Sequence, residues 1–374
     1  MRLSNPPQSV GGSTFRSKKY RQMDISSVMR YVLSGSRFFR NQVTSLTTDN
    51  AVHDASATQP DLTSLAQQAR WQVIKTVTNA KAGHIGGPMS MMDLLVTLYF
   101  EELRVDPSDP RADDRDRFVL SKGHAAIGLY SVLALRGFLP LDELATFDKG
   151  DSRLQGHPDM TRLPGLDSST GSLGQGLSVG VGMALGGQLG QKDFHTWVML
   201  GDGEIQEGMI WEAVQVAARY KLSNLTAIVD RNGLQQFGLP SSVETTLTDR
   251  GDRRDPWFGV DLAAVFQAFG WRVVEIDGHD YGQIRSAYKL ARAGDYEGRP
   301  TVIIAHTVKG KGLSLAEGVH TWHSIVPTAD DFEKARRELE PDELEILDNN
   351  PTSKNPTSTN PTSTNPTRKN GAKA

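Results

Sequence analysis

The sequence predicts an α/β protein built on a mostly parallel β-sheet with helices on both faces. Five short apolar runs, each ending in polar or glycine-rich residues, have the length and composition of buried strands. Helical stretches separate them, and strands that alternate with helices form parallel sheets covered on both sides. Hydrophobic residues make up 38% and charged residues 23% of the chain, which suits a soluble globular protein.

The elements follow in chain order. Residues 61–81 predict a first helix, and Ser90 with Asp93 predicts a capping box at the start of the next. The predicted strands are Phe118–Leu120, Trp197–Leu200, Leu225–Val229, Val273–Ile276 and Thr301–Ala305. Further helices are expected over Met209–Tyr220, Ile284–Ala293 and Asp330–Leu339. Because ligands of parallel sheets bind beyond the carboxyl ends of the strands, we expect the chemistry in the loops that follow them.

The two ends of the chain differ from its middle. Of the net charge of −3, residues 1–60 carry +5 and residues 349–374 carry +4, so the segment between them carries −12. The Arg- and Ser-rich start predicts a disordered basic extension or an over-long gene start, and an organelle transit peptide is the less favoured alternative. Residues 341–374 are predicted to be a disordered tail, because the Asn-Pro-Thr-Ser unit that repeats from Asn350 has no large apolar side chain. The folded domain is expected over residues 61–340.

Composition excludes several classes of function. The absence of cysteine excludes a disulfide scaffold, a thiolate zinc site and a cysteine nucleophile. No apolar run approaches the roughly 18 residues of a membrane-spanning helix, and the acidic middle argues against nucleic-acid binding. Without a secretory signal, a cytoplasmic protein is expected, with the transit peptide as the other possibility.

Two loops indicate a metal and phosphate site. Gly201-Asp202-Gly203 follows one predicted strand, and Asn232 follows the next, with 28 residues between Gly203 and Asn232. The intervening residues hold one helix, so both polar side chains leave the ends of parallel strands. A carboxylate and a carboxamide oxygen with a backbone carbonyl suit a hard cation that also binds phosphate. A lone Gly-Asp-Gly is as often a plain turn; the second loop makes the pattern specific.

With these loops, the chain resembles the thiamine diphosphate enzymes, and within them the transketolases. The family's motifs occur in order over about residues 62–330. The matching stretches are Gly83–Gly87, Ser121–Ala125, Gly156–Pro158, Thr170–Gly176, Gly201–Gly208, Asp230–Gly233, Lys309–Gly312 and His320–His323.

The resemblance implies a role for each matched site residue. Asp202, Asn232 and the carbonyl oxygen of Leu234 would hold Mg²⁺, Ca²⁺ or Mn²⁺ at the cofactor's diphosphate. The other implied contacts with the cofactor are His124, His320 and Gly203 at the diphosphate, and Gly171 and Leu173 beside the aminopyrimidine. The resemblance implies that His124 and His320 are catalytic as well. The other implied catalytic residues are His84 and His157, which would handle substrate protons, and Glu207 in an acidic cluster that links paired active sites.

The remaining histidines are interpreted as structural. His279 is expected in a turn with Asp280 as a helix cap, and His53, His195 and His306 are assigned no role. His323, next to a matched residue, could support the site from outside. The glycines between Gly174 and Gly190 predict close helix packing against a partner.

The resemblance also implies a partner. Transketolases of full length have three regions, and this chain matches only the first, which binds the diphosphate. The second binds the aminopyrimidine and supplies an activating glutamate. The chain is therefore expected to act with a C-terminal subunit in an α₂β₂ assembly, with the cofactor at the subunit interface. Ile85 and Ser172 stand where single-chain members commonly have proline, as in short-subunit relatives.

The implied reaction is transfer of a two-carbon ketol unit from a ketose-type donor to an aldehyde acceptor. Two alternatives remain open at this point. One is the α subunit of a 2-oxo-acid dehydrogenase or decarboxylase, against which the contexts of His84, His124 and His157 argue. The other is a non-catalytic scaffold, against which the intact Asp202 and Asn232 argue.

Overall fold

A five-stranded parallel sheet forms the centre of the fold. The computed structural model describes residues 61–236 and 260–340; the predicted extension and repeat tail lie outside the described residues. The sheet order is β1-β2-β3-β5-β4, and every neighbouring pair is parallel. The strands are β1 (Arg117–Leu120), β2 (Thr196–Gly201), β3 (Leu225–Arg231), β4 (Arg272–Asp277) and β5 (Thr301–His306).

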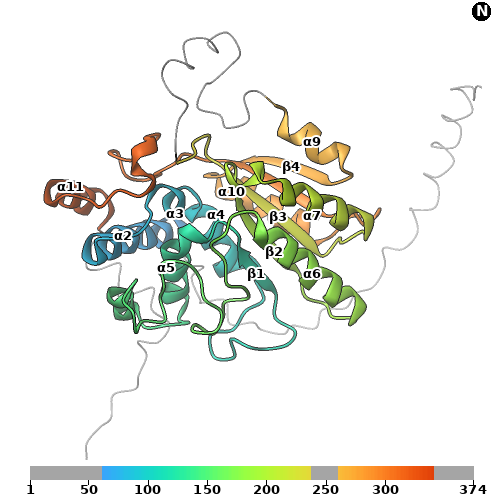
Figure 1. The fold of residues 1–374 in the computed structure, drawn as a ribbon, viewed down its shortest axis with the longest axis horizontal. Helices are drawn as coiled ribbons and strands as arrows, with labels where there is room; N and C mark the ends of the chain where they lie inside the picture. Colours follow the sequence, from blue (N-terminus) through green and yellow to red (C-terminus); the bar gives the residue numbers. More distant parts are fainter. Residues whose placement is uncertain (1–60, 237–259, 341–374) are drawn as a thin grey trace, which may run out of the picture. The chain divides into compact units, whose positions relative to one another are not determined.

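Helices cover both faces of this sheet (Figure 1). The longer ones are α2 (Leu62–Ala80), α5 (Ala126–Arg136), α6 (Gln175–Leu189), α7 (Gly208–Arg219), α10 (Tyr281–Arg292) and α11 (Ala329–Leu339). Shorter α-helices are α3 (Gly86–Ser90), α4 (Met92–Thr97) and α9 (Leu262–Ala268). A π-helical turn, η2 (Leu98–Glu102), and the 3₁₀ turns η3 (Gly123–Ala125), η4 (Leu141–Thr146), η5 (Glu204–Gln206) and η6 (His320–His323) complete the described elements.

Alternation along the strands produces two apolar cores. Trp197 and Met199 of β2 pack with α2, α4, α5 and α10 on one face of the sheet. Val198 and Leu200 pack with α6, α7 and α9 on the other. Because successive side chains of a strand point to opposite faces, a central parallel strand must be apolar throughout, as β2 is. No helix of the described segments combines the length and apolarity needed to cross a bilayer.

The predicted elements are confirmed with small shifts of their bounds. Each predicted strand is present and is longer by one or two residues, because the ladder hydrogen bonds continue into the polar ends. Asp61 caps α2 by accepting from the backbone N–H of Thr63, at 3.0 Å. The predicted cap of α10 is also confirmed, since Asp280 accepts from Gly282 N and Gln283 N.

The predicted capping box at Ser90 and Asp93 is wrong. Ser90 ends α3, and its hydroxyl donates to Asp230 Oδ2 at 2.6 Å and to Gly87 O at 3.0 Å. Asp93 instead accepts from Arg70 at 2.6 Å. Both side chains are buried, and their charged partners from distant segments form stronger hydrogen bonds than a helix end offers.

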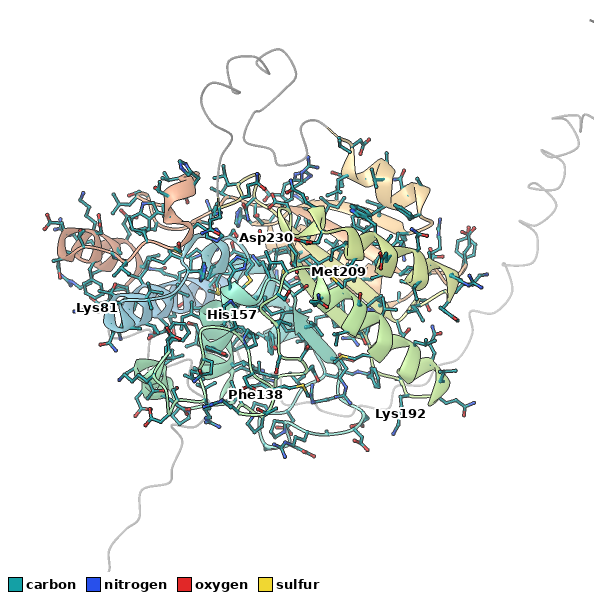
Figure 2. All side chains as sticks on the ribbon, viewed as in Figure 1. Lys81, Phe138, His157, Lys192, Met209 and Asp230 are labelled. Carbon is teal, nitrogen blue, oxygen red and sulfur yellow. The ribbon has the colours of Figure 1, made fainter. Side chains whose placement is uncertain are left out.

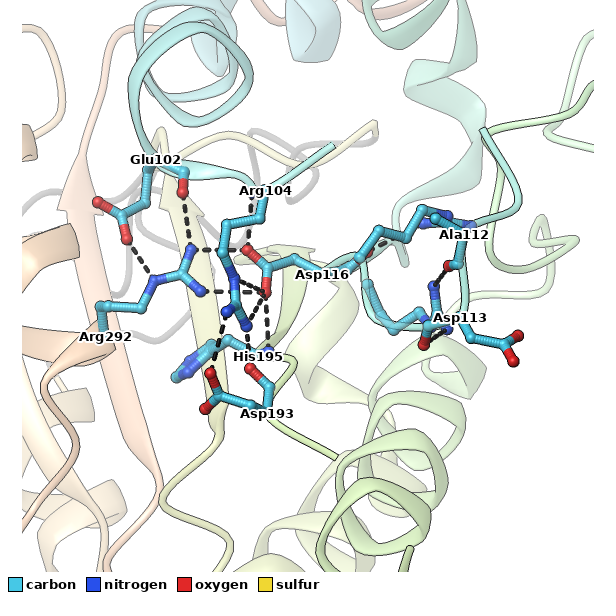
Figure 3. A network of polar contacts seen from close by, with 10 residues as sticks. Glu102, Arg104, Ala112, Asp113, Asp116, Asp193, His195 and Arg292 are labelled. Carbon is cyan, nitrogen blue, oxygen red and sulfur yellow. Dashed lines mark hydrogen bonds and ion pairs between the residues drawn. The ribbon is translucent and has the colours of Figure 1, made fainter. Parts of the chain in front are cut away.

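An ionic cluster around the buried Asp116 lies at the amino ends of β1 and β2 (Figure 3). Asp116 directly precedes β1, is fully buried, and accepts from Arg292 at 2.7 and 3.0 Å. Its carboxylate also accepts from the backbone N–H groups of Arg104 and His195, each at 2.9 Å. Arg292, at the end of α10, pairs in addition with Glu102 at 2.6 Å. Burial opposes ionisation of Asp116, but Arg292 and these donors hold its pKa below the usual value.

Candidate active site

A cavity of about 420 Å³ lies at the carboxyl edge of the sheet. It is bordered by the loops that follow β1, β2, β3 and β5, where the strand pattern predicts a ligand site. Eight of the predicted site residues line it: His84, His124, Gly171, Leu173, Asp202, Gly203, Asn232 and Leu234.

The loops after β2 and β3 meet through Asp202. Its carboxylate accepts from Gly203 N at 2.9 Å and from Gly233 N at 2.6 Å, so a single side chain joins both loops. Asn232 Oδ1 accepts from Leu234 N at 3.1 Å, which turns the chain so that Leu234 also reaches the cavity. One carboxylate, one carboxamide and one backbone carbonyl are thus brought together, as the spacing of the two loops predicts.

Three histidine rings gather in the same cavity. The ring centres of His84 and His124 lie 5.0 Å apart, those of His84 and His323 5.2 Å, and those of His124 and His323 5.1 Å. Burial is the main cause that lowers the pKa of His124 to about 2 and that of His323 to about 3, and nearby lysines add to it. The pKa of His84 is lowered by the same causes and by His157. In the free protein these rings are neutral hydrogen-bonding groups at pH 7.

Two buried lysines complete the polar lining. Lys122 donates to Gly87 O at 3.0 Å and forms an ion pair with Asp230. Lys309 donates to Leu234 O at 3.0 Å and lies 3.0 Å from Nδ1 of His323. Because the ammonium donates to Nδ1, the hydrogen of the neutral His323 ring is on Nε2, which can donate to a ligand.

Burial also shifts the pKa values of Asp202 and Lys309. It raises the pKa of Asp202 to about 7, with a further contribution from Asp230 and opposition from the two backbone donors. It lowers the pKa of Lys309 to about 8, partly offset by Asp202. Both groups are nearly inaccessible to solvent, and burial shifts the equilibrium of each toward its neutral form.

Glu204 connects three segments of the cavity wall through hydrogen bonds. Its carboxylate accepts from Ser121 Oγ at 2.5 Å, from Gly174 N at 3.0 Å and from Gly201 N at 3.0 Å. It therefore joins the loops after β1 and β2 to the segment that precedes α6. Gly174 has φ +86°, and a Cβ there would lie 2.8 Å from Glu207 Cβ, so this junction requires glycine.

Sequence reasoning assigned no role to Lys122, Glu204 or Lys309. All three lie inside motifs that match the family, and this was the only available signal. Their partners Asp230, Gly174 and Leu234 come from other segments, so the contacts that bring them to the cavity are visible only in the fold.

The structure moves one predicted residue out of the cavity. His320 is exposed and does not line it, whereas His323 does. The short turn η6 carries both residues, and Lys309 holds the ring of His323 inward. The motif match alone could not distinguish two histidines three residues apart.

Two further predicted residues lie at the edge of the site. His157 lines a shallow neighbouring hollow, and its ring would lie 3.1 Å from a Cβ on Gly171. Glu207 is exposed and packs against Gly174, outside the cavity lining. His157 thus borders the cavity through Gly171, and Glu207 faces solvent in the single chain.

The histidines interpreted as structural have partners elsewhere. His279 accepts from Val308 N at 2.9 Å and pairs with Asp93 at 2.7 Å. His195 is buried against Thr226, at 2.8 Å, and His306 pairs with Glu275 on the surface at 2.9 Å. His53 lies outside the described residues.

The cavity fits thiamine diphosphate with a divalent cation. No three His, Cys, Asp or Glu side chains within residues 61–236 and 260–340 could together hold a metal. A cation here would have three oxygen ligands from the chain and need others from a phosphate, which is typical of Mg²⁺. Two ammonium groups and neutral imidazoles supply donors for the diphosphate oxygens. A Cβ on Gly87 would lie 3.5 Å from His124 Nε2 and 3.8 Å from Lys122 Nζ, within the space among these donors.

Comparison with known proteins agrees with this chemistry. Residues 62–349 match the family described as transketolase, thiamine diphosphate binding domain. One subunit of the apulose-4-phosphate transketolase from Phocaeicola vulgatus is 42% identical over 275 residues, 73% of this chain and 92% of that protein. The SqwG subunit of the 6-deoxy-6-sulfo-D-fructose transketolase from a Clostridium species is 38% identical over 285 residues, 76% of this chain and 98% of that protein.

Solved transketolases share the fold. The enzyme from Leishmania mexicana aligns with a TM-score of 0.66 and 29% identity, over 76% of this chain and 42% of that chain. A transketolase from Pichia stipitis in complex with sedoheptulose-7-phosphate aligns with a TM-score of 0.66 and 32% identity, over 75% and 41%. This chain spans about two fifths of those chains but nearly the whole of the two bacterial subunits. The chain therefore belongs to the transketolase family, as the thiamine diphosphate-binding N-terminal subunit of a split enzyme.

Proposed function

We propose that the cavity binds the diphosphate end of thiamine diphosphate through a divalent cation held by Asp202, Asn232 and the carbonyl oxygen of Leu234. The observation that carries this proposal is the presence of complementary groups in one buried cavity. Oxygen ligands for a cation lie beside the ammonium groups of Lys122 and Lys309, which suit phosphate. When bound, the cofactor supplies the electron sink for breaking and forming a carbon–carbon bond.

The histidines of the site have two roles, binding of the diphosphate and transfer of substrate protons. His124 and the Nε2–H of His323 donate hydrogen bonds to the diphosphate, because both rings are neutral and lie beside the lysines. His84 lines the cavity and is close enough to His157 for that ring to lower its pKa, so these two handle protons on substrate hydroxyls. Gly171 and Leu173 border the aminopyrimidine.

The remainder of the active site comes from a C-terminal subunit with a pyrimidine-binding domain and an activating glutamate, in an α₂β₂ assembly. The outer surface of α6 and α7 supports such an assembly. α6 packs on the sheet through one face and presents an apolar one outward, with Val179 and Leu189 exposed beside Gly182 and Gly186. Val216 of α7 and Tyr220, which follows it, are exposed as well. Several large apolar side chains exposed on neighbouring helices favour contact with another chain.

The substrates are a ketose donor with an anionic group and an aldehyde acceptor. Two relatives are named for apulose-4-phosphate and for 6-deoxy-6-sulfo-D-fructose, which share a ketose and a terminal anion. The reaction cleaves the bond between the donor's carbonyl-side two-carbon unit and the rest of the sugar. The 2-oxo-acid dehydrogenase alternative is disfavoured by the transketolase family match.

The experiment compares the full chain alone with the chain co-expressed with its C-terminal subunit. Thiamine diphosphate binding and ketol transfer from a phosphorylated ketose are measured with Mg²⁺ present. We expect no turnover by the chain alone and activity in the complex. Turnover by the lone chain at the rate of the complex would contradict the shared active site.

An Asp202→Ala variant of the complex tests the cation site, with Asp109→Ala as control on an exposed loop. Asp202→Ala removes a charged ligand and is expected to abolish Mg²⁺-dependent cofactor binding, while Asp109→Ala binds as the wild type does. Unchanged affinity in Asp202→Ala would refute the assignment of the cation site.

A further inference from the structure

Asp230 lies at the carboxyl end of the central strand, β3 (Figure 2). The residue is fully buried and is not part of the cavity lining. Its carboxylate accepts from Lys122, Ser90, Thr307 and Asn232. These donors come from the loops after β1, β3 and β5 and from α3, so one carboxylate connects every segment around the cation site except that of Asp202.

The contact with Asn232 decides which way its amide faces. Asn232 Nδ2 donates to Asp230 Oδ2 at 3.2 Å, and Asn232 Oδ1 accepts from Leu234 N at 3.1 Å. A carboxylate without a proton can only accept, so the NH₂ end must face Asp230. The oxygen end is thereby directed to the side of the cavity and of Leu234.

We propose that Asp230 is a positioning residue, which holds the Asn232 carboxamide so that its oxygen, and not its nitrogen, faces the divalent cation. The proposal rests on the cation site proposed above. A carboxamide in the other orientation would present NH₂ to the cation and lose a ligand. Ligands of metals are commonly oriented in this way by a hydrogen bond from the opposite side.

The surroundings explain why Asp230 is not itself a ligand. Both of its oxygens accept hydrogen bonds. Oδ2 accepts from Ser90, Lys122 and Asn232, and Oδ1 accepts from Thr307. Lys122 offsets its charge in an ion pair of which both side chains are buried. Asp230 therefore orients Asn232 without adding a second uncompensated negative charge beside Asp202.

The first test substitutes Asn232→Asp in the full chain assembled with its C-terminal subunit. The readout is the Mg²⁺ concentration that half-saturates thiamine diphosphate binding, followed by tryptophan fluorescence without substrate. A carboxylate is ordinarily the stronger Mg²⁺ ligand. Here, however, it would lie next to Asp230 Oδ2, so the half-saturating Mg²⁺ concentration is expected to rise about tenfold or more.

The exchanged pair Asp230→Asn/Asn232→Asp restores one carboxylate and one carboxamide and is expected to recover most of the loss. Equal or tighter Mg²⁺ binding by Asn232→Asp, or no recovery in the exchanged pair, would overturn the proposal. Failure of the wild-type complex to bind thiamine diphosphate would instead overturn the proposed cation and cofactor site.

A second set of variants covers the case in which Asn232→Asp does not fold. In a Lys122→Met background, which removes the counter-ion, Asp230→Asn keeps an acceptor for Asn232 and Asp230→Ala does not. Relative to Lys122→Met alone, Asp230→Asn is expected to leave the Mg²⁺ requirement unchanged and Asp230→Ala to raise it about tenfold. Equal Mg²⁺ requirements in the two double variants would show that Asp230 serves only as the counter-ion of Lys122.

Discussion

His320 and His323 are three residues apart on η6, yet only His323 lines the cavity. Lys309 explains the difference, because its ammonium lies 3.0 Å from Nδ1 of His323 and fixes the ring. His320 is exposed and has no comparable role in the cavity.

Substitution of each histidine by alanine distinguishes the contributions of His320 and His323 to cofactor binding. His323→Ala removes a hydrogen bond to a charged ligand, which contributes about 1.5–3 kcal/mol, so the Kd for thiamine diphosphate is expected to rise about tenfold or more. His320→Ala should leave this Kd within a factor of about two. The measurement is titration of the complex by isothermal calorimetry, with thermal unfolding as a check on folding. A larger effect in His320→Ala would restore the original motif assignment.

The raised pKa of Asp202 predicts a pH dependence of cation binding. Burial first, and then Asp230, raise this pKa to about 7, so the metal-free carboxyl group is protonated below that pH. A cation must displace the proton, and its apparent affinity is expected to fall about tenfold per pH unit below about pH 7. Mg²⁺ titrations between about pH 5 and pH 8 measure the slope, and a flat profile would contradict the shift.

The raised pKa of Asp202 also makes the stability of the metal-free chain depend on pH. Because the folded pKa lies above the unfolded value, the stability that this group gives the metal-free chain is complete below about pH 4 and is lost as the pH rises through about 7. Asp202→Asn removes the titration, so the difference in unfolding free energy between variant and wild type should change over this range. A constant difference would mean that Asp202 titrates normally.

At the scale of the element, the glycines of α6 differ in their surroundings: some pack against the sheet and others face solvent. A Cβ on Gly180 would lie 2.4 Å from Val198 Cγ2 of β2, whereas a Cβ on Gly186 would meet open space. Gly180→Ala is therefore expected to lower the unfolding free energy of the isolated chain by about 1–3 kcal/mol through overpacking. Gly186→Ala should raise it by up to about 1 kcal/mol through helix propensity. Urea unfolding measures both, and equal effects would contradict the assigned face of α6.

The strands could be predicted from sequence because a parallel strand covered on both faces is a local apolar run. The contacts of Ser90 and Asp93 could not, because their partners Asp230 and Arg70 come from distant segments and outcompete a local cap. The same limit applies to the candidate site. Asp202 and Asn232 belong to a motif with fixed spacing, whereas the place of Lys309 depends on the loops that it joins.

At the scale of the whole molecule, the described residues form a cavity at one edge of the sheet, and two relatives covered almost completely by this chain are named as subunits of transketolases. Charge is arranged accordingly. The cavity is lined by buried lysines and neutral histidines and by few carboxylates. This lining suits an anionic ligand that is bound together with a cation. The apolar face of α6 and the exposed Glu207 lie outside that cavity, where another chain can reach them.

The ionic cluster around Asp116 lies at the amino ends of the strands whose carboxyl ends carry the cavity (Figure 3). Arg104 and Arg292 hold that end together through contacts that involve no cavity residue. The two ends of the sheet can therefore accumulate substitutions separately during evolution. A lineage that adapts to a new sugar can change the loops at one end while inheriting the stabilising cluster at the other unchanged.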